Sequence, residues 1–100
     1  MGKRARMKQE RLAGKLLQIR NGLGLSQNEM LRYLGFGDVI DYKRISEYEL
    51  GKSEPPLAVL LQYARVAGLH MEDIVDDELD LPGKLPGPVR YKGINRASVS

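Results

Sequence analysis

The side chains best suited to molecular recognition lie close together between residues 42 and 47. They are Tyr42, Lys43, Arg44, Ser46 and Glu47. They flank Ile45 and Tyr48, whose spacing of three places both on the inner face of a helix. An arginine can bond bidentately to guanine, a lysine can bond to guanine or phosphate, and a glutamate can accept a hydrogen bond from cytosine. This combination therefore matches the base edges and the phosphate backbone of DNA.

The helix that carries these side chains needs a start signal. Two aspartates could cap it, Asp38 or Asp41. We prefer Asp41, because that choice gives Ile40 and Ile45 the spacing of a hydrophobic staple. The helix then runs from about residue 41 to residue 50, whereas a cap at Asp38 would add one turn.

A shorter helix is predicted just before it, from residue 26 to residue 34. Ser26 is a favourable N-cap, and Glu29 stands three residues later, so the two form a capping box. Gly35 follows the last apolar residue of the pattern, where a left-handed residue commonly ends a helix. Two short helices joined by a turn that contains glycine indicate a helix-turn-helix motif.

Two further residues are candidates for phosphate contacts. Gln27 lies in the first turn of the earlier helix, beside backbone N–H groups that suit an anion. Lys52 follows Gly51, the glycine that ends the later helix. The predicted DNA-binding set therefore consists of Gln27, Tyr42, Lys43, Arg44, Ser46, Glu47 and Lys52.

Three more helices complete the predicted all-α fold. The first, from about residue 8 to residue 21, has Leu12, Leu16 and Ile19 at helical spacing, with its basic residues outside. The next helix has Pro55-Pro56 at its first turn, an apolar stripe from Leu57 to Ala64 and Gly68 as its stop, and the last covers about residues 71–75. The expected organisation is a basic arm at residues 1–7, a helix-turn-helix domain at 8–76 and an extended tail at 77–100. Proline and glycine are frequent in this tail, and we expect it to be mobile from about Leu81.

The composition argues against an enzyme. The 100 residues include no cysteine and a single histidine, His70. The carboxylates between residues 72 and 80 lack the pattern of a calcium loop. No nucleophile–base pair is apparent, so we expect no catalytic residue, no cofactor and no metal ion. No apolar run approaches the roughly 18 residues of a membrane span, and no signal peptide is recognisable. The expectation is a soluble cytoplasmic protein without a membrane partner.

The charge pattern is uneven although the net charge is only +3. Residues 1–20 contain seven basic residues and one acidic residue, and residues 82–100 contain four basic residues and no acidic one. Residues 71–81 contain six acidic residues and no basic one. Basic ends around a near-neutral centre suit contact with a polyanion.

Several short motifs resemble, in their order and spacing, the Cro-type or xenobiotic-response-element helix-turn-helix family. They are Arg20, Leu25-Ser26-Gln27, Leu34-Gly35, Ile45-Ser46, Tyr48-Glu49, Gly51, Pro56-Leu57, Leu60-Leu61 and the segment from Ala64 to Leu69. The resemblance covers about residues 8–76. It implies a compact five-helix, lambda-repressor-like domain whose third helix enters the DNA major groove. It also implies that Gln27 touches the DNA backbone and that Arg20 and Glu49 form a structural pair.

The chain departs from the family pattern at two places. Residues 37–40 look inserted between the second and third helices, where the family has a shorter turn. Leu31 stands where the family tends to have a small residue. Both features favour a wider turn, which could shift the angle at which the third helix docks.

The expected function is that of a sequence-specific transcriptional regulator that binds double-stranded DNA. We expect a homodimer on a palindromic operator, since one recognition helix reads few base pairs. The predicted dimer surface surrounds the last helix, although the same residues could instead close the monomer core. They are Leu69, Met71, Ile74, Val75 and Leu79. The alternative is an antitoxin or similar protein whose tail engages a second protein. Neutralisation should then require residues 82–100, whereas operator binding should not.

Overall fold

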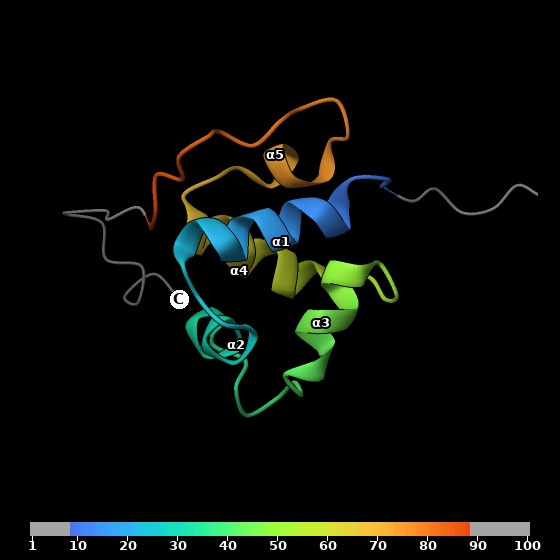
Figure 1. Cartoon of the computed structure of the whole chain (residues 1–100), viewed down its shortest axis with the longest axis vertical. Helices are drawn as coiled ribbons and strands as arrows, with labels where there is room; N and C mark the ends of the chain where they lie inside the picture. Colours follow the sequence, from blue (N-terminus) through green and yellow to red (C-terminus); the bar gives the residue numbers. More distant parts are fainter. Residues whose placement is uncertain (1–8, 89–100) are drawn as a thin grey trace, which may run out of the picture.

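Five α-helices build the chain in the computed structural model, which describes residues 9–88 (Figure 1). They are α1 (Leu12–Leu23), α2 (Gln27–Leu34), α3 (Lys43–Leu50), α4 (Leu57–Ala67) and α5 (Met71–Val75). No strand occurs between residues 9 and 88, and the predicted all-α, five-helix fold is confirmed. The basic arm predicted at residues 1–7 and the part of the predicted tail beyond Pro88 lie outside the described residues.

Each helix contributes to a single apolar core. The largest fully buried side chains are Leu16 and Ile19 of α1, Met30 and Leu34 of α2, Ile45 of α3, Val59 and Tyr63 of α4, and Ile74 of α5. Burial of a large apolar side chain stabilises a fold by roughly 1.5–3 kcal/mol. The orientation of α3 is therefore fixed by the same core that holds the other four helices.

Both ends of α2 follow the sequence prediction. The Ser26 hydroxyl accepts from the backbone N–H of Glu29 at 3.1 Å, and the Ser26 N–H donates to the Glu29 carboxylate at 2.8 Å. Gly35 ends the helix with φ of 89°, a left-handed conformation that disfavours residues with a β-carbon. The predicted capping box and glycine stop are both confirmed.

The start of α3 lies beside Asp41 rather than Asp38, but the N-cap position is Tyr42, one residue later than predicted. The Asp41 carboxylate accepts from the backbone N–H of Lys43 at 3.0 Å, and its carbonyl accepts from the N–H of Arg44 at 2.9 Å. The regular helix begins at Lys43, two residues after the predicted start, because the first bonds span three residues rather than four. Ile40 packs against the core that contains Ile45.

The N-terminus of α1 differs from the prediction. The helix begins at Leu12 rather than at residue 8, and a carboxylate distant in sequence occupies its end. Asp77 accepts from the backbone N–H groups of Glu10 and Arg11 at 2.7 and 3.0 Å. These two bonds lower the pKa of Asp77. The contact is therefore present near neutral pH and is lost as the pH falls through the folded-state pKa.

Residues 77–88 lie along the body of the domain, and we call this segment the strap. The Arg11 guanidinium donates to the carbonyls of Asp77 and Leu79 and to the carboxylate of Asp80, at 2.7, 3.2 and 2.6 Å. Leu81 is buried and Leu85 packs against the core. Figure 1 shows the strap in orange, running past α5 along the side of α1 on which α5 lies. The sequence predicted a mobile tail from about Leu81 and did not predict that Leu81 and Leu85 contact the core.

A short repeat explains why the strap contacts the core. Leu-Pro-Gly occurs at residues 81–83 and again at 85–87, and the sequence analysis missed it. The two leucines turn inward while the neighbouring prolines stay exposed. The N–H of Gly87 then donates to the carbonyl of Ala67, the last residue of α4, at 2.9 Å. A β-carbon at Gly68 would lie 2.0 Å from the Gly87 carbonyl oxygen, so this crossing requires glycine.

Lys15 is the exception to the expected basic outer face of α1. Its side chain is buried, and its ammonium group donates to the carbonyls of Asp73 and Asp76 at 2.8 and 2.7 Å. These are carbonyls at the C-terminal end of α5, where a cation also meets the negative end of the helix dipole. Lys15 therefore attaches α5 to α1.

The apolar residues around α5 close the monomer core. Ile74 is fully buried, and Leu69, Met71 and Val75 pack against the core cluster. The sequence left two roles open for these residues, a dimer surface or closure of the monomer core. The packing in the structure corresponds to closure of the core.

Removal of the strap should destabilise the domain. A chain that ends after Asp76 should have a free energy of unfolding at least about 2 kcal/mol lower than a chain that ends after Pro88. The figure comes from the lost burial of Leu81 alone. The shorter chain also lacks the Asp77 cap on α1. Urea denaturation of the two chains measures the difference. Equal midpoints and equal slopes would show that the strap contributes nothing to the fold.

Candidate nucleic-acid interface

The outer face of α3 presents the predicted recognition side chains to solvent. Tyr42, Lys43 and Arg44 are exposed, and Ser46 and Glu47 are partly exposed. Ile45 and Tyr48 point into the core from the opposite side of the helix. The structure therefore gathers five of the seven predicted DNA-binding residues on one surface.

Arg44 and Glu47 form an ion pair on this face, at 3.0 Å between Nη1 and Oε1. The side chains are 56% and 41% exposed, so water screens the pair and its contribution to stability is small. Arg44 can therefore give up its bond to Glu47 and bond to a guanine or a phosphate instead at little cost in free energy. The pair also places a hydrogen-bond acceptor beside the guanidinium donors.

Gln27 is bonded differently from the sequence expectation. Its side-chain amide donates to Oε1 of Glu49 at 3.1 Å, and the residue is half-buried. The bond ties the first turn of α2 to the last turn of α3. The amide oxygen of Gln27 has no part in this bond and can accept a hydrogen bond. The free N–H groups of a helix N-terminus also favour an anion near this point.

Arg20 and Glu49 form the structural pair that the family resemblance implies. The guanidinium donates two hydrogen bonds to the carboxylate, at 2.6 and 3.0 Å. The side chains are only 16% and 5% exposed. The hydrogen bond that Arg20 donates to Glu49 raises the pKa of Arg20.

A third bond from Arg20 extends this connection. Its Nη1 donates to the carbonyl of Leu25, in the corner between α1 and α2, at 2.9 Å. We call Arg20, Gln27 and Glu49 the polar lock, since they join α1, α2 and α3. The polar lock sets the position of α3 relative to α2.

Lys52 stands apart from the other predicted contacts. It is exposed and follows Gly51, which ends α3 with φ of 76°. An eight-residue helix is about 12 Å long, so Lys52 lies about that far from the first turn of α3. Lys43 and Lys52 can therefore reach different phosphates, one at each end of the helix.

The turn between α2 and α3 adds residues that the sequence analysis left without a role. The N–H groups of Val39 and Ile40 both donate to the carbonyl of Phe36, at 3.0 and 2.9 Å. Phe36 and Ile40 pack against the core, whereas Val39 points away from it. In Figure 1 this turn lies at the lower edge of the molecule, next to the first turn of α3.

The acidic residues lie mainly on another side of the molecule. Six carboxylates occur between residues 72 and 80, in α5 and the first part of the strap. Figure 1 shows α5 and the strap on one side of α1, with α2 and α3 on the other. This arrangement keeps most of the negative charge away from the face that bears Lys43 and Arg44.

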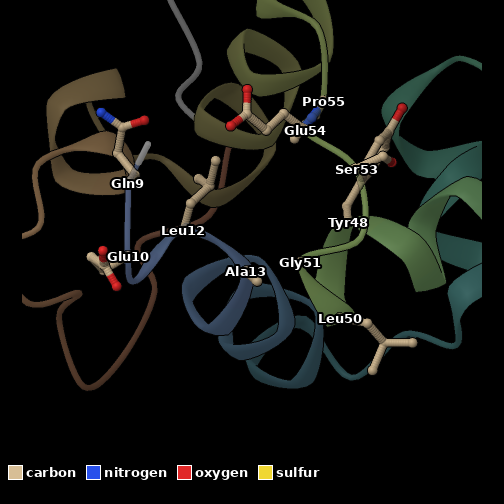
Figure 2. Close-up of a pocket in the computed structure, with 10 residues that line it drawn as sticks. All are labelled: Gln9, Glu10, Leu12, Ala13, Tyr48, Leu50, Gly51, Ser53, Glu54 and Pro55. Carbon is tan, nitrogen blue, oxygen red and sulfur yellow. The ribbon is translucent and has the colours of Figure 1, made fainter. Parts of the chain in front are cut away.

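An open pocket of about 440 Å³ lies between the N-terminal end of α1 and the loop after α3 (Figure 2). Its walls include the apolar side chains of Leu12 and Leu50, and two carboxylates, Glu10 and Glu54, also line it. Carboxylates repel phosphate, so the pocket is not suited to the DNA backbone. No cluster of metal-ligating side chains was found among residues 9–88.

The comparisons with known proteins agree with this geometry. A family model described as helix-turn-helix matches residues 16–74, which is more than half of the chain. No curated protein and no solved structure matches the chain. In the part of the chain that the structure describes, none of the helices is long and apolar enough to cross a membrane.

Proposed function

Because the chain belongs to the Cro-type, or xenobiotic-response-element, helix-turn-helix family of DNA-binding regulators, we propose that α3 reads a specific sequence in the major groove of double-stranded DNA. The main support is the two-sided character of α3. Ile45 and Tyr48 anchor one side in the core, while Tyr42, Lys43 and Arg44 are exposed on the other. A helix held in this way can enter the groove without a change in the fold.

The same arrangement supports phosphate contacts that set the position of α3 on the duplex. Gln27 lies at the first turn of α2, and Lys52 lies beyond the last turn of α3. Contacts with the backbone fix register and orientation, whereas contacts with base edges carry the sequence information. We assign Gln27 and Lys52 to the backbone, and Arg44 to a base edge.

Selection from a random library of DNA duplexes with the purified protein tests the proposal. A regulator of this type should enrich one sequence motif strongly over several rounds. Enrichment of no motif, with equal affinity for all duplexes at about 150 mM salt, would refute sequence-specific reading. The enriched duplex then serves as the probe in the experiments below.

Substitutions in the first turn of α3 should separate the two kinds of contact. Arg44→Ala should cost roughly 1–3 kcal/mol of binding free energy and relax the preference at one base pair. Lys43→Ala, if Lys43 meets only phosphate, should weaken binding to all sequences about equally and lower the salt slope by about one. Lys52→Ala should behave like Lys43→Ala.

The measurement is a salt-dependent titration of each variant against the enriched duplex and a scrambled duplex. All three side chains are exposed, so the melting curves should be unchanged. Unchanged affinity, specificity and salt slope in a Lys43→Ala/Arg44→Ala double variant would show that α3 is not the reading element.

We also propose that the protein binds a palindromic operator as a homodimer. One recognition helix reads few base pairs, and a two-fold pair doubles the contacts. Since the residues around α5 close the monomer core, Leu50 and Leu57 are better candidates for the dimer surface. They are 64% and 74% exposed, around the loop that joins α3 to α4. Sedimentation that shows only monomer, with and without the enriched duplex, would rule the dimer out.

The alternative in which the tail engages a second protein has less support. Leu85, near the start of the predicted interacting segment 82–100, already packs against the domain, as does Leu81 just before that segment. A partner would therefore have to displace them or use residues beyond Pro88. Removal of residues 89–100 should leave operator binding by α3 in place.

A further inference from the structure

We infer that Val39, in the turn between α2 and α3, contacts the 5-methyl group of a thymine in the major groove. The inference rests on the proposed function, in which α3 reads a DNA sequence. It gives the inserted turn a role of its own, namely to extend base recognition beyond the residues of α3. Val39 would then be a specificity-determining residue outside the recognition helix.

The exposure of Val39 is the first observation. At 78%, it is the most exposed of the large apolar side chains between residues 9 and 88. Single exposed apolar residues are common on protein surfaces, so exposure alone does not indicate a contact. In this turn, however, the exposed residue lies between two residues that are anchored in the core.

The anchoring of the turn is the second observation. Phe36 and Ile40 pack against the core on either side of Val39. The N–H of Phe36 donates to the carbonyl of Leu31 at 3.2 Å, and the Phe36 carbonyl accepts the N–H groups of Val39 and Ile40. The backbone therefore holds the valine outward in a defined position. Little conformational entropy remains to be lost when it meets a partner.

The position of the turn is the third observation. Asp41 follows the turn directly, and its carboxylate accepts from the first N–H of α3. Tyr42, which is 50% exposed, stands three residues after Val39. Figure 1 shows the turn and the start of α3 at the same end of the molecule. A duplex that meets the first turn of α3 therefore lies beside Val39 as well.

The charge of the turn determines which part of the duplex it can meet. Residues 36–41 include two carboxylates, Asp38 and Asp41, and no basic side chain. Phosphate repels carboxylates, so this turn is not suited to the DNA backbone. In the floor of the major groove, the thymine methyl group is the feature that an apolar side chain can recognise. Val39 has only methyl groups to offer, and they complement that feature.

Replacement of thymine by deoxyuridine tests this directly, because it removes only the methyl group. Each thymine of the duplex enriched by the wild-type protein is replaced in turn. At one thymine, the wild-type protein should lose about fourfold in affinity, the effect of exposing one buried methyl group. Val39→Ala should bind the thymine duplex about fourfold more weakly and should lose nothing further with deoxyuridine at that position.

Two comparisons make the result decisive. Lys43→Ala is the matched control, because it changes an exposed residue close by. It should still lose about fourfold in affinity when deoxyuridine replaces that thymine. Val39→Ala should melt at the wild-type temperature, because the side chain is exposed. If Val39→Ala shows the wild-type ratio of thymine to deoxyuridine affinity at every position, the inference is overturned while reading by α3 stands. If the wild-type protein prefers no sequence at all, the proposed function fails and the inference fails with it.

Discussion

Arg20→Met should lower the free energy of unfolding by about 3–5 kcal/mol. The substitution leaves the carboxylate of Glu49 without its charged partner in a position where only 5% of the side chain is exposed. Removal of one member of a buried ion pair typically has a cost of this size, because an uncompensated charge remains in a medium of low polarity. The carbonyl of Leu25 and the amide of Gln27 would also lose part of their network.

A double variant separates the charge effect from the loss of packing. Arg20→Met/Glu49→Leu replaces both charges by apolar side chains, and pairs replaced in this way are often as stable as the original. Urea denaturation should therefore show that the double variant recovers most of the stability that Arg20→Met loses. If Arg20→Met alone unfolds at the wild-type urea concentration, the polar lock is not a structural element.

Ile45→Ala should lower the free energy of unfolding by about 2–5 kcal/mol, since it opens a cavity where the recognition helix enters the core. The side chain is fully buried and is the main apolar anchor of α3 beside Tyr48. Ile45→Val, which removes a single methylene group, should cost only about 0.5–1.5 kcal/mol. Lys43→Ala, two residues away on the exposed face, is the control and should leave the urea midpoint unchanged. Wild-type stability of Ile45→Ala would mean that this side of α3 does not face the core.

Local signals in the sequence predicted most of the helical framework. Ser26 and Glu29 define the start of α2, and Gly35 defines its end, through contacts within a few residues of each other. Asp41 was preferred to Asp38 by the same kind of local reasoning, and its carboxylate accepts an N–H at the start of α3. The Arg20–Glu49 pair came from the family resemblance, because no pattern of spacing connects residues that lie 29 positions apart.

Contacts between distant segments could not be predicted in this way. Asp77 appeared to be one of several solvated carboxylates, yet it accepts the N–H groups of Glu10 and Arg11, 67 and 66 residues away. Lys15 fitted the basic outer face of a helix, and only the packing of α5 shows that it points inward. The helical start predicted at residue 8 was wrong for the same reason, since the chain before Leu12 bends toward Asp77.

The strap shows a different limit of sequence reasoning. Its prolines and glycines exclude regular structure, and that part of the reading agrees with the absence of helix in residues 77–88. Irregular structure does not imply a lack of contacts, however. The repeated Leu-Pro-Gly was a detectable signal, because two leucines four residues apart in a segment without helix can both face the core. At the candidate interface, Tyr42, Lys43, Arg44, Ser46 and Glu47 are exposed or partly exposed as expected, and their contacts with DNA stay a prediction. The bond from Gln27 to Glu49 was not foreseen.

The face that binds DNA can be identified most directly by nuclear magnetic resonance of the labelled protein during titration with the enriched duplex. The account predicts that the backbone amide shifts concentrate at the start of α2, from Ser26 to Asn28, and along residues 38–47. A smaller group should occur at Lys52. Amides of α5 and of the strap, on the other side of α1, should change little. Large shifts confined to α5 and the strap, with α3 unaffected, would contradict the claim that α3 reads the duplex.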